Sequence, residues 1–248
     1  MPLQRSGFHP DTPMSQDRLS QFAGTWLLLD SGPGEPAWNM ALDEALLESA
    51  AQRTEPVLRF YSWTTPAATF GYFQPYEQVA RWTSVRPLVR RPTGGGLVLH
   101  IADWTYSLVF PRAHPWYALR AMESYRQLHH WLQTAFLELG IRSDLASEPR
   151  KEHPGQCFAG PERFDLVWAG RKMAGAAQRR TRHGLLIQGS VQPAQAWDRT
   201  AWQTALASAA QRLWGASWTQ WQPPEPILSR AQQLADQKYS QPAYNQRR

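Results

Sequence analysis

The stretch RRPTGGGLVLH, residues 90–100, interrupts a strand-like run with three consecutive glycines. Glycine inside a strand costs roughly 1 kcal/mol relative to alanine, so three in a row indicate either a tight turn or a ligand that approaches the backbone closely. Arg90 and Arg91 place positive charge just before the glycines, and loop amides beside such charge suit an extended or anionic ligand. A plain hairpin turn is the alternative, because turns are the commonest use of glycine.

Two common glycine-rich phosphate loops do not fit this stretch. A Walker A loop is excluded because no Gly-Lys-Ser/Thr follows the glycines. A dinucleotide-binding fingerprint is excluded because Leu99 occupies its third glycine position and no helix pattern follows.

The patterns on both sides of the glycines predict an α+β fold. Strand-like segments outnumber helical ones and do not alternate regularly with them, which favours a mixed or antiparallel sheet with helices packed on it. Strands are predicted at 25–32, 56–63, 67–73, on both sides of the glycines, and at 104–110, 164–180 and 184–192, and helices at 35–53, 116–140, 200–215 and about 224–238.

Length and composition limit the possible classes of protein. The 248 residues suffice for one substantial core, and we expect a flexible arm over residues 1–24 and a single domain over residues 25–248. The single cysteine excludes an intrachain disulfide framework, and no Cys/His spacing resembles a metal site. No apolar leader or membrane-length run occurs, so we expect a soluble, cytoplasmic protein without a membrane partner.

The charge balance is positive, with 26 basic against 20 acidic residues and a net charge of +6. This favours an acidic partner. The basic residues are dispersed, which makes nucleic acid an unlikely partner. The run RRTRH, residues 179–183, is either a solvated turn or a docking point for such an acidic partner.

Only three basic residues are lysines, namely Lys151, Lys172 and Lys238. Arginine is otherwise the cation of this chain, so a lysine is more informative than usual. Lys172 lies in GRKMAG, where a solvated hairpin lysine is the simplest interpretation. A compact ammonium also suits stabilisation of developing negative charge.

Five segments, taken in order, resemble the lipoate–protein ligase and octanoyltransferase family, which is related more distantly to biotin–protein ligases. The order of the five is far more specific than any one of them. Besides the glycine stretch they are NMALDEALL (39–47), PAATFGYFQ (66–74), GRKMAGAAQRR (170–180) with GLLIQGSV (184–191), and QKYSQPAYNQRR (237–248).

The resemblance implies a biotin/lipoate ligase-like catalytic domain that attaches lipoyl or octanoyl groups to a lysine of a lipoyl domain or glycine-cleavage H protein. The glycine-rich strands would then form part of an acyl tunnel, with Leu97, Leu99, Phe70 and Tyr72 as apolar lining. The substrate-binding residues implied by the resemblance are Arg90, Arg91, Thr93, Gly94, Gly95, Gly96, His100, Gly71, Tyr72, Gly175 and Ala177.

Cys157 lies in GQCFAGPERFDL, whose Cys-Phe-x-x-Pro pattern followed by an acidic residue and leucine is similar to that of cysteine-dependent octanoyltransferases. The resemblance implies that Cys157 takes the acyl group from octanoyl-acyl-carrier protein as a thioester, with Lys172 as the second catalytic residue and no cofactor. A small buried apolar cysteine is the alternative, although the loop composition around it argues against a core position.

Two other functions remain open from the sequence. Gly96 stands where many octanoyltransferases carry arginine, which is closer to ATP-dependent lipoate ligases that need ATP and Mg and no cysteine. A non-catalytic acyl-binding protein on the same scaffold is the third possibility. His100, followed by Asp103, is expected to be structural more often than catalytic, and His129 and His130 are expected on the surface of their helix.

Overall fold

The computed structural model describes residues 22–150 and 155–247 of the chain. The arm predicted over residues 1–24 lies outside this part except for its last three residues, of which Phe22 is buried in the core.

Strands outnumber helices in the described part of the chain, as the sequence predicts. The strands are β1 (Gly24–Gly34), β2 (Val57–Trp63), β3 (Ala67–Phe70), β4 (Leu88–Arg90), β5 (Val98–His100), β6 (Trp104–Pro111), β7 (Asp144–Leu145), β8 (Leu166–Trp168), β9 (Arg171–Arg180), β10 (Gly184–Val191) and β11 (Ala216–Gln220).

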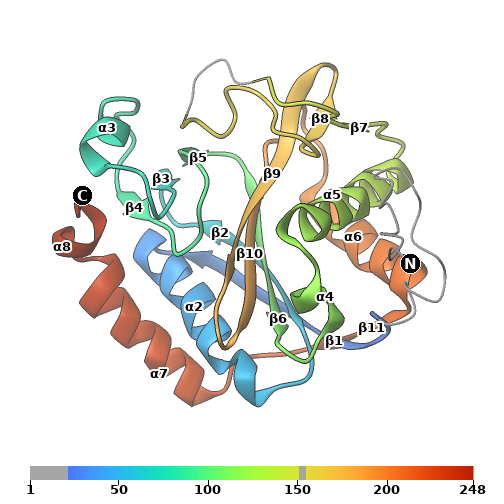
Figure 1. The fold of residues 1–248 in the computed structure, drawn as a ribbon, viewed down its shortest axis with the longest axis horizontal. Helices are drawn as coiled ribbons and strands as arrows, with labels where there is room; N and C mark the ends of the chain where they lie inside the picture. The colour runs from blue at the N-terminus through green and yellow to red at the C-terminus, as the bar shows by residue number, and fades with distance from the viewer. Residues whose placement is uncertain (1–21, 151–154, 248) are drawn as a thin grey trace, which may run out of the picture.

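Two sheets form from these strands within the described residues (Figure 1). The large sheet has eight strands in the order β11-β1-β2-β6-β10-β9-β8-β7, and the small one has the order β4-β3-β5. The β1–β2 and β1–β11 pairs are parallel and the other pairs of the large sheet are antiparallel, so the sheet is mixed. The predicted hairpin of β9 and β10 is present, with Leu185 opposite Arg180.

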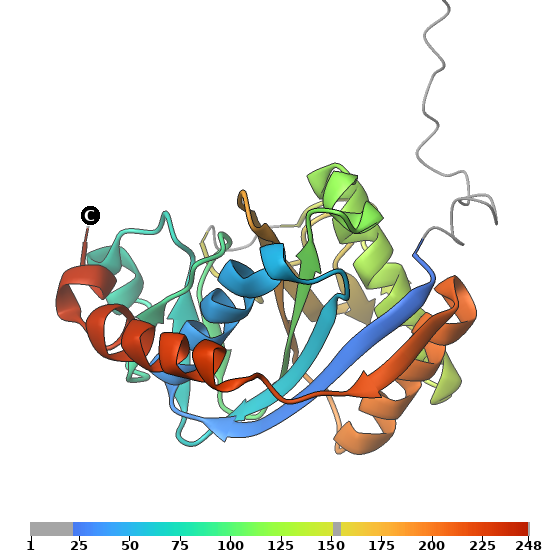
Figure 2. The ribbon, with the colours of Figure 1, turned by 90° about the horizontal axis from the view of Figure 1, so that it is seen from below.

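Helices cover both faces of the large sheet (Figures 1 and 2). On one face α2 and α7 pack on an apolar cluster that includes Leu46 and Leu186, and on the other face α4, α5 and α6 pack on a cluster rich in tryptophan. The helices are α2 (Pro36–Ser49), α3 (Tyr76–Ala80), α4 (Pro115–Ala118), α5 (Ala121–Glu138), α6 (Arg199–Trp214), α7 (Glu225–Leu234) and α8 (Pro242–Asn245), with a 3₁₀ turn at Ala50–Gln52 and a π turn at Ala235–Tyr239.

Local sequence explains where the helices begin and end. The Asp198 carboxylate caps α6 by accepting from the amides of Thr200 and Ala201, and Gly215 ends this helix with φ +70°. The single helix predicted over 116–140 is wrong, because Leu119 and Arg120 are extended and separate α4 from α5. The carbonyl of Leu119 that this break leaves free accepts from Arg180 at 2.7 Å instead.

The small sheet sits beside the large one and carries the glycine stretch between β4 and β5. Mixed sheets with helices packed on them make this an α+β fold, as predicted. No helix in the described part of the chain is long and apolar enough to cross a membrane.

Candidate active site

Cys157 lies on a segment that pairs with the end of the glycine stretch. The Leu97 amide donates to the Gly155 carbonyl at 2.8 Å, and the Cys157 amide donates to the Leu97 carbonyl at 3.0 Å. A side chain on Gly96 would meet the Gly155 oxygen at 2.3 Å, so only glycine permits this pairing. The third glycine of the stretch therefore brings the cysteine segment against the glycines. His153, which the sequence places near Cys157, lies outside the described residues.

Two groups face the Cys157 sulfur. The Gly96 amide donates to Sγ at 3.0 Å, and the Arg91 guanidinium lies beside it, since a Cβ on Gly95 would be 3.3 Å from Arg91 Nη2 and 3.6 Å from Sγ. Backbone amides and a neighbouring cation both stabilise negative charge on sulfur, and only the thiolate is nucleophilic. The half-buried Cys157 thus has the surroundings of a reactive cysteine.

Arg91 is buried and hydrogen-bonds to the glycine loop and to β3. Its Nη1 donates to Thr69 Oγ1 at 2.8 Å, and its Nη2 donates to the carbonyls of Gly94 at 3.0 Å and Gly96 at 2.8 Å. Burial lowers the pKa of Arg91, and the adjacent Cys157 raises it. These bonds hold the backbone of the glycine loop, residues 93–96, around the guanidinium.

Lys172 forms a buried ion pair with Asp165. The Nζ–Oδ2 distance is 2.7 Å, and the side chains are 4% and 0% exposed. Asp165 also accepts from the Tyr125 hydroxyl and from the Glu162 amide, and the ammonium lies 5.0 Å from the centre of the Phe158 ring. The solvated lysine that the hairpin position suggested is therefore not what the structure contains.

A cavity that is partly open to solvent joins these groups. Six of the residues predicted for the site line it, from three separate parts of the chain. They are Cys157, Lys172, Arg91, His100, Gly175 and Ala177, and the other described lining residues are Met40, Tyr61, Thr69, Val98, Thr105, Phe158, Ala176, Gln188, Gly189 and Ser190.

Gly95 lies beside the sulfur, next to residues that line the cavity. Its φ is +84°, and a Cβ there would lie 3.3 Å from Arg91 Nη2, 3.5 Å from Ala177 Cβ and 3.6 Å from Cys157 Sγ. Gly71 supports the same loop from behind, because a side chain on it would meet the Gly95 oxygen at 1.8 Å. Gly71 thus lets two backbone segments approach closely, and Gly95 lets the backbone approach the site.

Arg90 is not among the described residues that line the cavity. Its guanidinium donates to carbonyls of the C-terminal segment, at 3.3 Å to Tyr244, 3.0 Å to Asn245 and 2.6 Å to Arg247, and at 2.7 Å to those of Tyr72 and Gln74. The structure therefore places Arg90 where it ties the C-terminus to the small sheet.

Tyr72 also lies in this C-terminal contact. Arg247 and Arg179 stack on its ring at 4.2 and 5.2 Å, and the first of these contacts lowers the pKa of Tyr72. Neither Tyr72 nor the other three apolar residues expected in the tunnel is among the described lining residues. Phe70 and Leu97 pack in a separate apolar cluster and Leu99 is 38% exposed. Val98 and His100 of β5 face the cavity instead, because alternate strand residues point to opposite faces.

His129 is a correction to the sequence analysis. It was expected on the helix surface, but it is 0% exposed and packs against the Tyr125 ring at a tilt, with ring centres 4.2 Å apart. Burial lowers its pKa to about 4, so it is neutral at pH 7. His130 is exposed, as expected.

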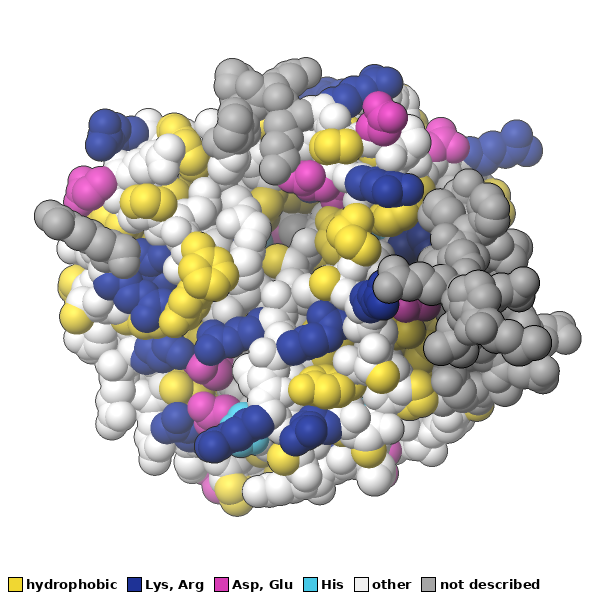
Figure 3. All heavy atoms as spheres, viewed as in Figure 1, with side chains coloured by type: hydrophobic (Ala, Val, Ile, Leu, Met, Phe, Trp, Pro, Cys, Tyr) yellow, Lys and Arg dark blue, Asp and Glu magenta, His cyan; other side chains and the backbone are white. Residues whose placement is uncertain are grey.

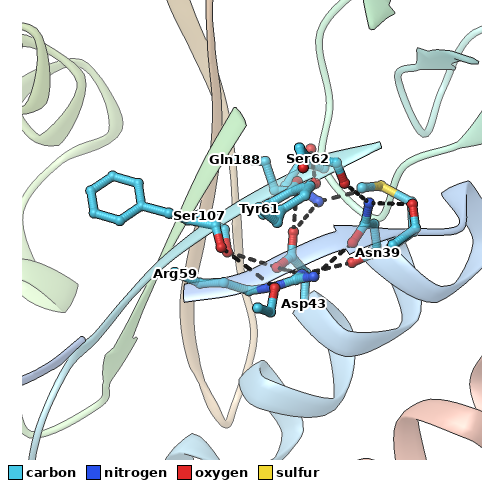
Figure 4. Close-up of polar contacts among 12 residues, drawn as sticks. Asn39, Asp43, Arg59, Tyr61, Ser62, Ser107 and Gln188 are labelled. Carbon is cyan, nitrogen blue, oxygen red and sulfur yellow. Dashed lines mark hydrogen bonds and ion pairs between the residues drawn. The ribbon is translucent and has the colours of Figure 1, made fainter. Parts of the chain in front are cut away.

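A buried polar cluster lies beneath the cavity and links α2 to the glycine loop (Figure 4). Arg59 and Asp43 pair at 2.7 Å with exposures of 1% and 0%. Gln188 donates to Asp43 at 2.7 Å and accepts from Thr93 at 2.7 Å. Thr93, predicted as substrate-binding, thus connects the glycine loop to this cluster. The other labelled members are Asn39, Tyr61, Ser62 and Ser107.

Residues 35–195 match the lipoyl protein ligase A/B catalytic domain. The chain belongs to this family.

Relatives in the family support the assignment. The chain is 38% identical over 180 residues to octanoyltransferase LipM of Bacillus subtilis, covering 67% of this chain and 65% of that protein. It is 40% identical over 178 residues to octanoyltransferase LipM of Moorella thermoacetica, covering 68% and 65%. The chain thus spans just under two thirds of the length of these curated relatives.

A bi-partite lipoate protein ligase of Thermoplasma acidophilum, studied with its E2 lipoyl domain, shares the fold. The TM-score is 0.70 at 20% identity, covering 91% of this chain and 96% of that one. This confirms the predicted ligase-like catalytic-domain fold.

Several residues at the family site were missed from the sequence. Asp165 is the acidic residue of the cysteine motif, but the motif does not show that it pairs with Lys172. Tyr125 and Thr69 gave no signal, because a tyrosine in a helix and a threonine in a strand are ordinary. Among the described residues, no group of three or more His, Cys, Asp or Glu side chains is placed to hold a metal ion.

Proposed function

We propose that this protein is an acyltransferase that moves an octanoyl group through a Cys157 thioester to a lysine of a lipoyl domain or glycine-cleavage H protein. The observation that carries the proposal is the chain's single cysteine, which lines a largely apolar cavity with the Gly96 amide on its sulfur and Arg91 beside it. The 38–40% identity to octanoyltransferases supports the octanoyl group as the substrate.

In the first step the Cys157 thiolate attacks the carbonyl carbon of octanoyl-acyl-carrier protein. A new carbon–sulfur bond forms to Cys157, and the bond to the carrier's thiol breaks, which releases that thiol as a thiolate. Lys172 stabilises the negative charge that develops on the carbonyl oxygen, and its ion pair with Asp165 holds the ammonium in place without reorganisation.

In the second step the neutral amine of the acceptor lysine attacks the Cys157 thioester. An amide bond forms, the Cys157 thiolate leaves, and the proton of the amine passes to solvent. Conversion of a thioester into an amide runs downhill, so this step drives the overall transfer. The Gly96 amide and Arg91 stabilise the departing thiolate as they do the attacking one.

The cavity walls suit an acyl chain. Met40, Val98, Ala176 and Ala177 are small or flexible apolar residues on the lining. Burying hydrocarbon contributes about 0.8 kcal/mol per methylene, which anchors a small substrate strongly.

The partners implied are an acidic acyl-carrier protein as donor and a lipoyl domain or H protein as acceptor. Lys and Arg side chains gather across the middle and lower part of the face that carries the β9–β10 hairpin (Figure 3). Such a surface steers acidic proteins towards the site. The T. acidophilum ligase with its E2 lipoyl domain supports a lipoyl domain as acceptor.

The proposed transfer needs no cofactor, and intact-mass analysis tests it. Purified protein is mixed with octanoyl-acyl-carrier protein, with and without ATP and Mg, and a lipoyl domain is then added. We expect an octanoyl adduct on the protein without ATP, its transfer to the lipoyl domain, and loss of both in Cys157→Ala. If Cys157→Ala modifies the lipoyl domain when lipoate and ATP are supplied, the protein is a ligase. If neither the octanoyl adduct nor a modified lipoyl domain forms, the protein is a non-catalytic acyl-binding protein.

A further inference from the structure

A chain of hydrogen bonds runs along the cavity wall from Arg91 to Asp103. Arg91 Nη1 contacts Thr69 Oγ1 at 2.8 Å, Thr69 Oγ1 contacts His100 Nε2 at 2.8 Å, and His100 Nδ1 contacts Asp103 Oδ2 at 2.8 Å. Arg91 Nη2 and Cys157 Sγ lie 3.3 and 3.6 Å from the point that a Cβ on Gly95 would occupy, so this relay of Thr69, His100 and Asp103 ends beside the sulfur.

The donors and acceptors of the relay fit in one direction only. A guanidinium can only donate, so Thr69 Oγ1 accepts from Arg91 and its own hydrogen points to His100 Nε2. The Asp103 carboxylate can only accept, so Nδ1 carries the hydrogen of the neutral ring and donates to Asp103, and Nε2 accepts from the Thr69 hydroxyl.

The far end of the relay is firmly anchored. Asp103 Oδ2 also accepts from Ser190 Oγ at 2.7 Å and from Thr105 Oγ1 at 3.0 Å. The Trp63 ring stacks on His100 with centres 4.0 Å apart at 23°. Thr69, His100 and Asp103 are 0%, 4% and 7% exposed, so water does not compete with their bonds.

We propose that Thr69, His100 and Asp103 are positioning residues that hold the Arg91 guanidinium against the Cys157 sulfur. The proposal rests on the proposed function in that Cys157 is taken as the nucleophile. None of the three hydrogen-bonds to the sulfur, so their effect on Cys157 passes through Arg91. Asp103 fixes the histidine tautomer, the histidine fixes the threonine hydroxyl, and the hydroxyl fixes Arg91.

The test measures the alkylation rate of Cys157 by iodoacetamide from pH 6 to 9, which requires no acyl substrate. We expect Thr69→Val to slow alkylation at pH 7 by about 10-fold, since an acceptor for a charged group is lost. The rate–pH curve should shift to higher pH, and Thr69→Ser should restore most of the rate. Asp103→Asn should act in the same direction, because an amide donating to Nδ1 would impose the wrong tautomer. Arg91→Met should slow alkylation at least as much.

Ser124→Ala is the matched control, because it removes a fully buried hydroxyl outside the site, on α5. It should leave the alkylation rate unchanged. Wild-type alkylation rates in both folded Thr69→Val and Asp103→Asn would overturn the proposal, as would a slow rate in Thr69→Val that Thr69→Ser does not restore. If Thr69→Val does not fold, Asp103→Asn decides alone. If these variants slow alkylation but the wild-type protein transfers no octanoyl group, the relay is upheld and the proposed function is rejected.

Discussion

At the scale of single residues, the Lys172–Asp165 pair decides what the lysine can do. A Cβ on Gly175 would lie 2.6 Å from Lys172 Cε and 2.7 Å from Nζ, so the ammonium already fills the space over this glycine. A guanidinium is larger and planar and does not fit there. The bare backbone at Gly175 is therefore part of how the lysine reaches both Asp165 and the cavity.

We predict that Lys172→Arg loses most octanoyl transfer and that Lys172→Ala loses on the order of 10²-fold or more, since stabilisation of the developing oxyanion is removed. Single-turnover transfer from octanoyl-acyl-carrier protein measures this. Lys238→Arg is the control, because Lys238 is also ion-paired, to Glu44, but far from the cysteine in the C-terminal π turn. An active Lys172→Arg variant would reduce Lys172 to a generic cation.

At the scale of elements, the glycine loop has a left-handed backbone at Gly95, and this residue lies close to the side chains of the site. We predict that Gly95→Val folds but blocks the cavity, because a β-branched residue resists φ +84° and its side chain enters the space between Arg91, Ala177 and Cys157. Acyl-enzyme formation should become undetectable by intact mass.

Gly140→Val provides the matched control for strain alone. Gly140 has φ +75° and no atom within 4 Å of a built Cβ, so the substitution costs a similar backbone strain of roughly 1–3 kcal/mol. Acylation should survive in this variant. Acylation at the wild-type rate in Gly95→Val would mean that the loop is only a turn.

The C-terminal segment is an element held largely by one side chain. The Arg90 guanidinium donates to three of its carbonyls, and the Arg90 amide donates to the side-chain oxygen of Asn245 at 2.9 Å. We predict that Arg90→Met destabilises the protein by about 2–4 kcal/mol, since several charge-assisted bonds are lost. It should also expose the segment to trypsin at Lys238.

Limited proteolysis with mass detection, alongside urea unfolding, measures both effects. Arg86→Met is the control, because Arg86 is exposed and bonds only to nearby carbonyls. A stable, protease-resistant Arg90→Met variant with impaired substrate binding would instead return Arg90 to the substrate-binding role expected from the sequence.

At the scale of the whole molecule, two buried histidines couple stability to pH. Burial lowers the pKa of His129 and of His114 to about 4, against an unfolded value near 6.5. The unfolded chain therefore binds more protons below pH 6.5. Stability is complete above that pH and is lost as pH falls from 6.5 towards 4.

We predict that each of these histidines costs about 2 kcal/mol of stability between pH 7 and pH 5. Urea unfolding at the two pH values should show this loss reduced by that amount in His129→Gln. The same substitution at the adjacent exposed His130 should leave the pH dependence as in the wild type. Equal slopes in His129→Gln and the wild type would mean that His129 is not held neutral in the folded protein.

The sequence by itself determined the fold class and the family, and it predicted the residues of the candidate site. Glycine spacing, the lone cysteine in its motif and a rare lysine are local signals, and they keep their meaning whatever the chain packs against. The β9–β10 hairpin and most helix positions follow from local pattern in the same way. The break between α4 and α5 does not, because it depends on Arg180, which bonds to the Leu119 carbonyl from another part of the chain.

Only the tertiary structure decided which neighbours each site residue meets. Arg91 reaches the sulfur whereas Arg90 turns to the C-terminus, and Val98 lines the cavity whereas Leu97 and Leu99 do not. The physical reason is the same in both cases. Adjacent residues of an extended chain point to opposite sides, and which side is the site depends on pairing with strands and loops far away in sequence.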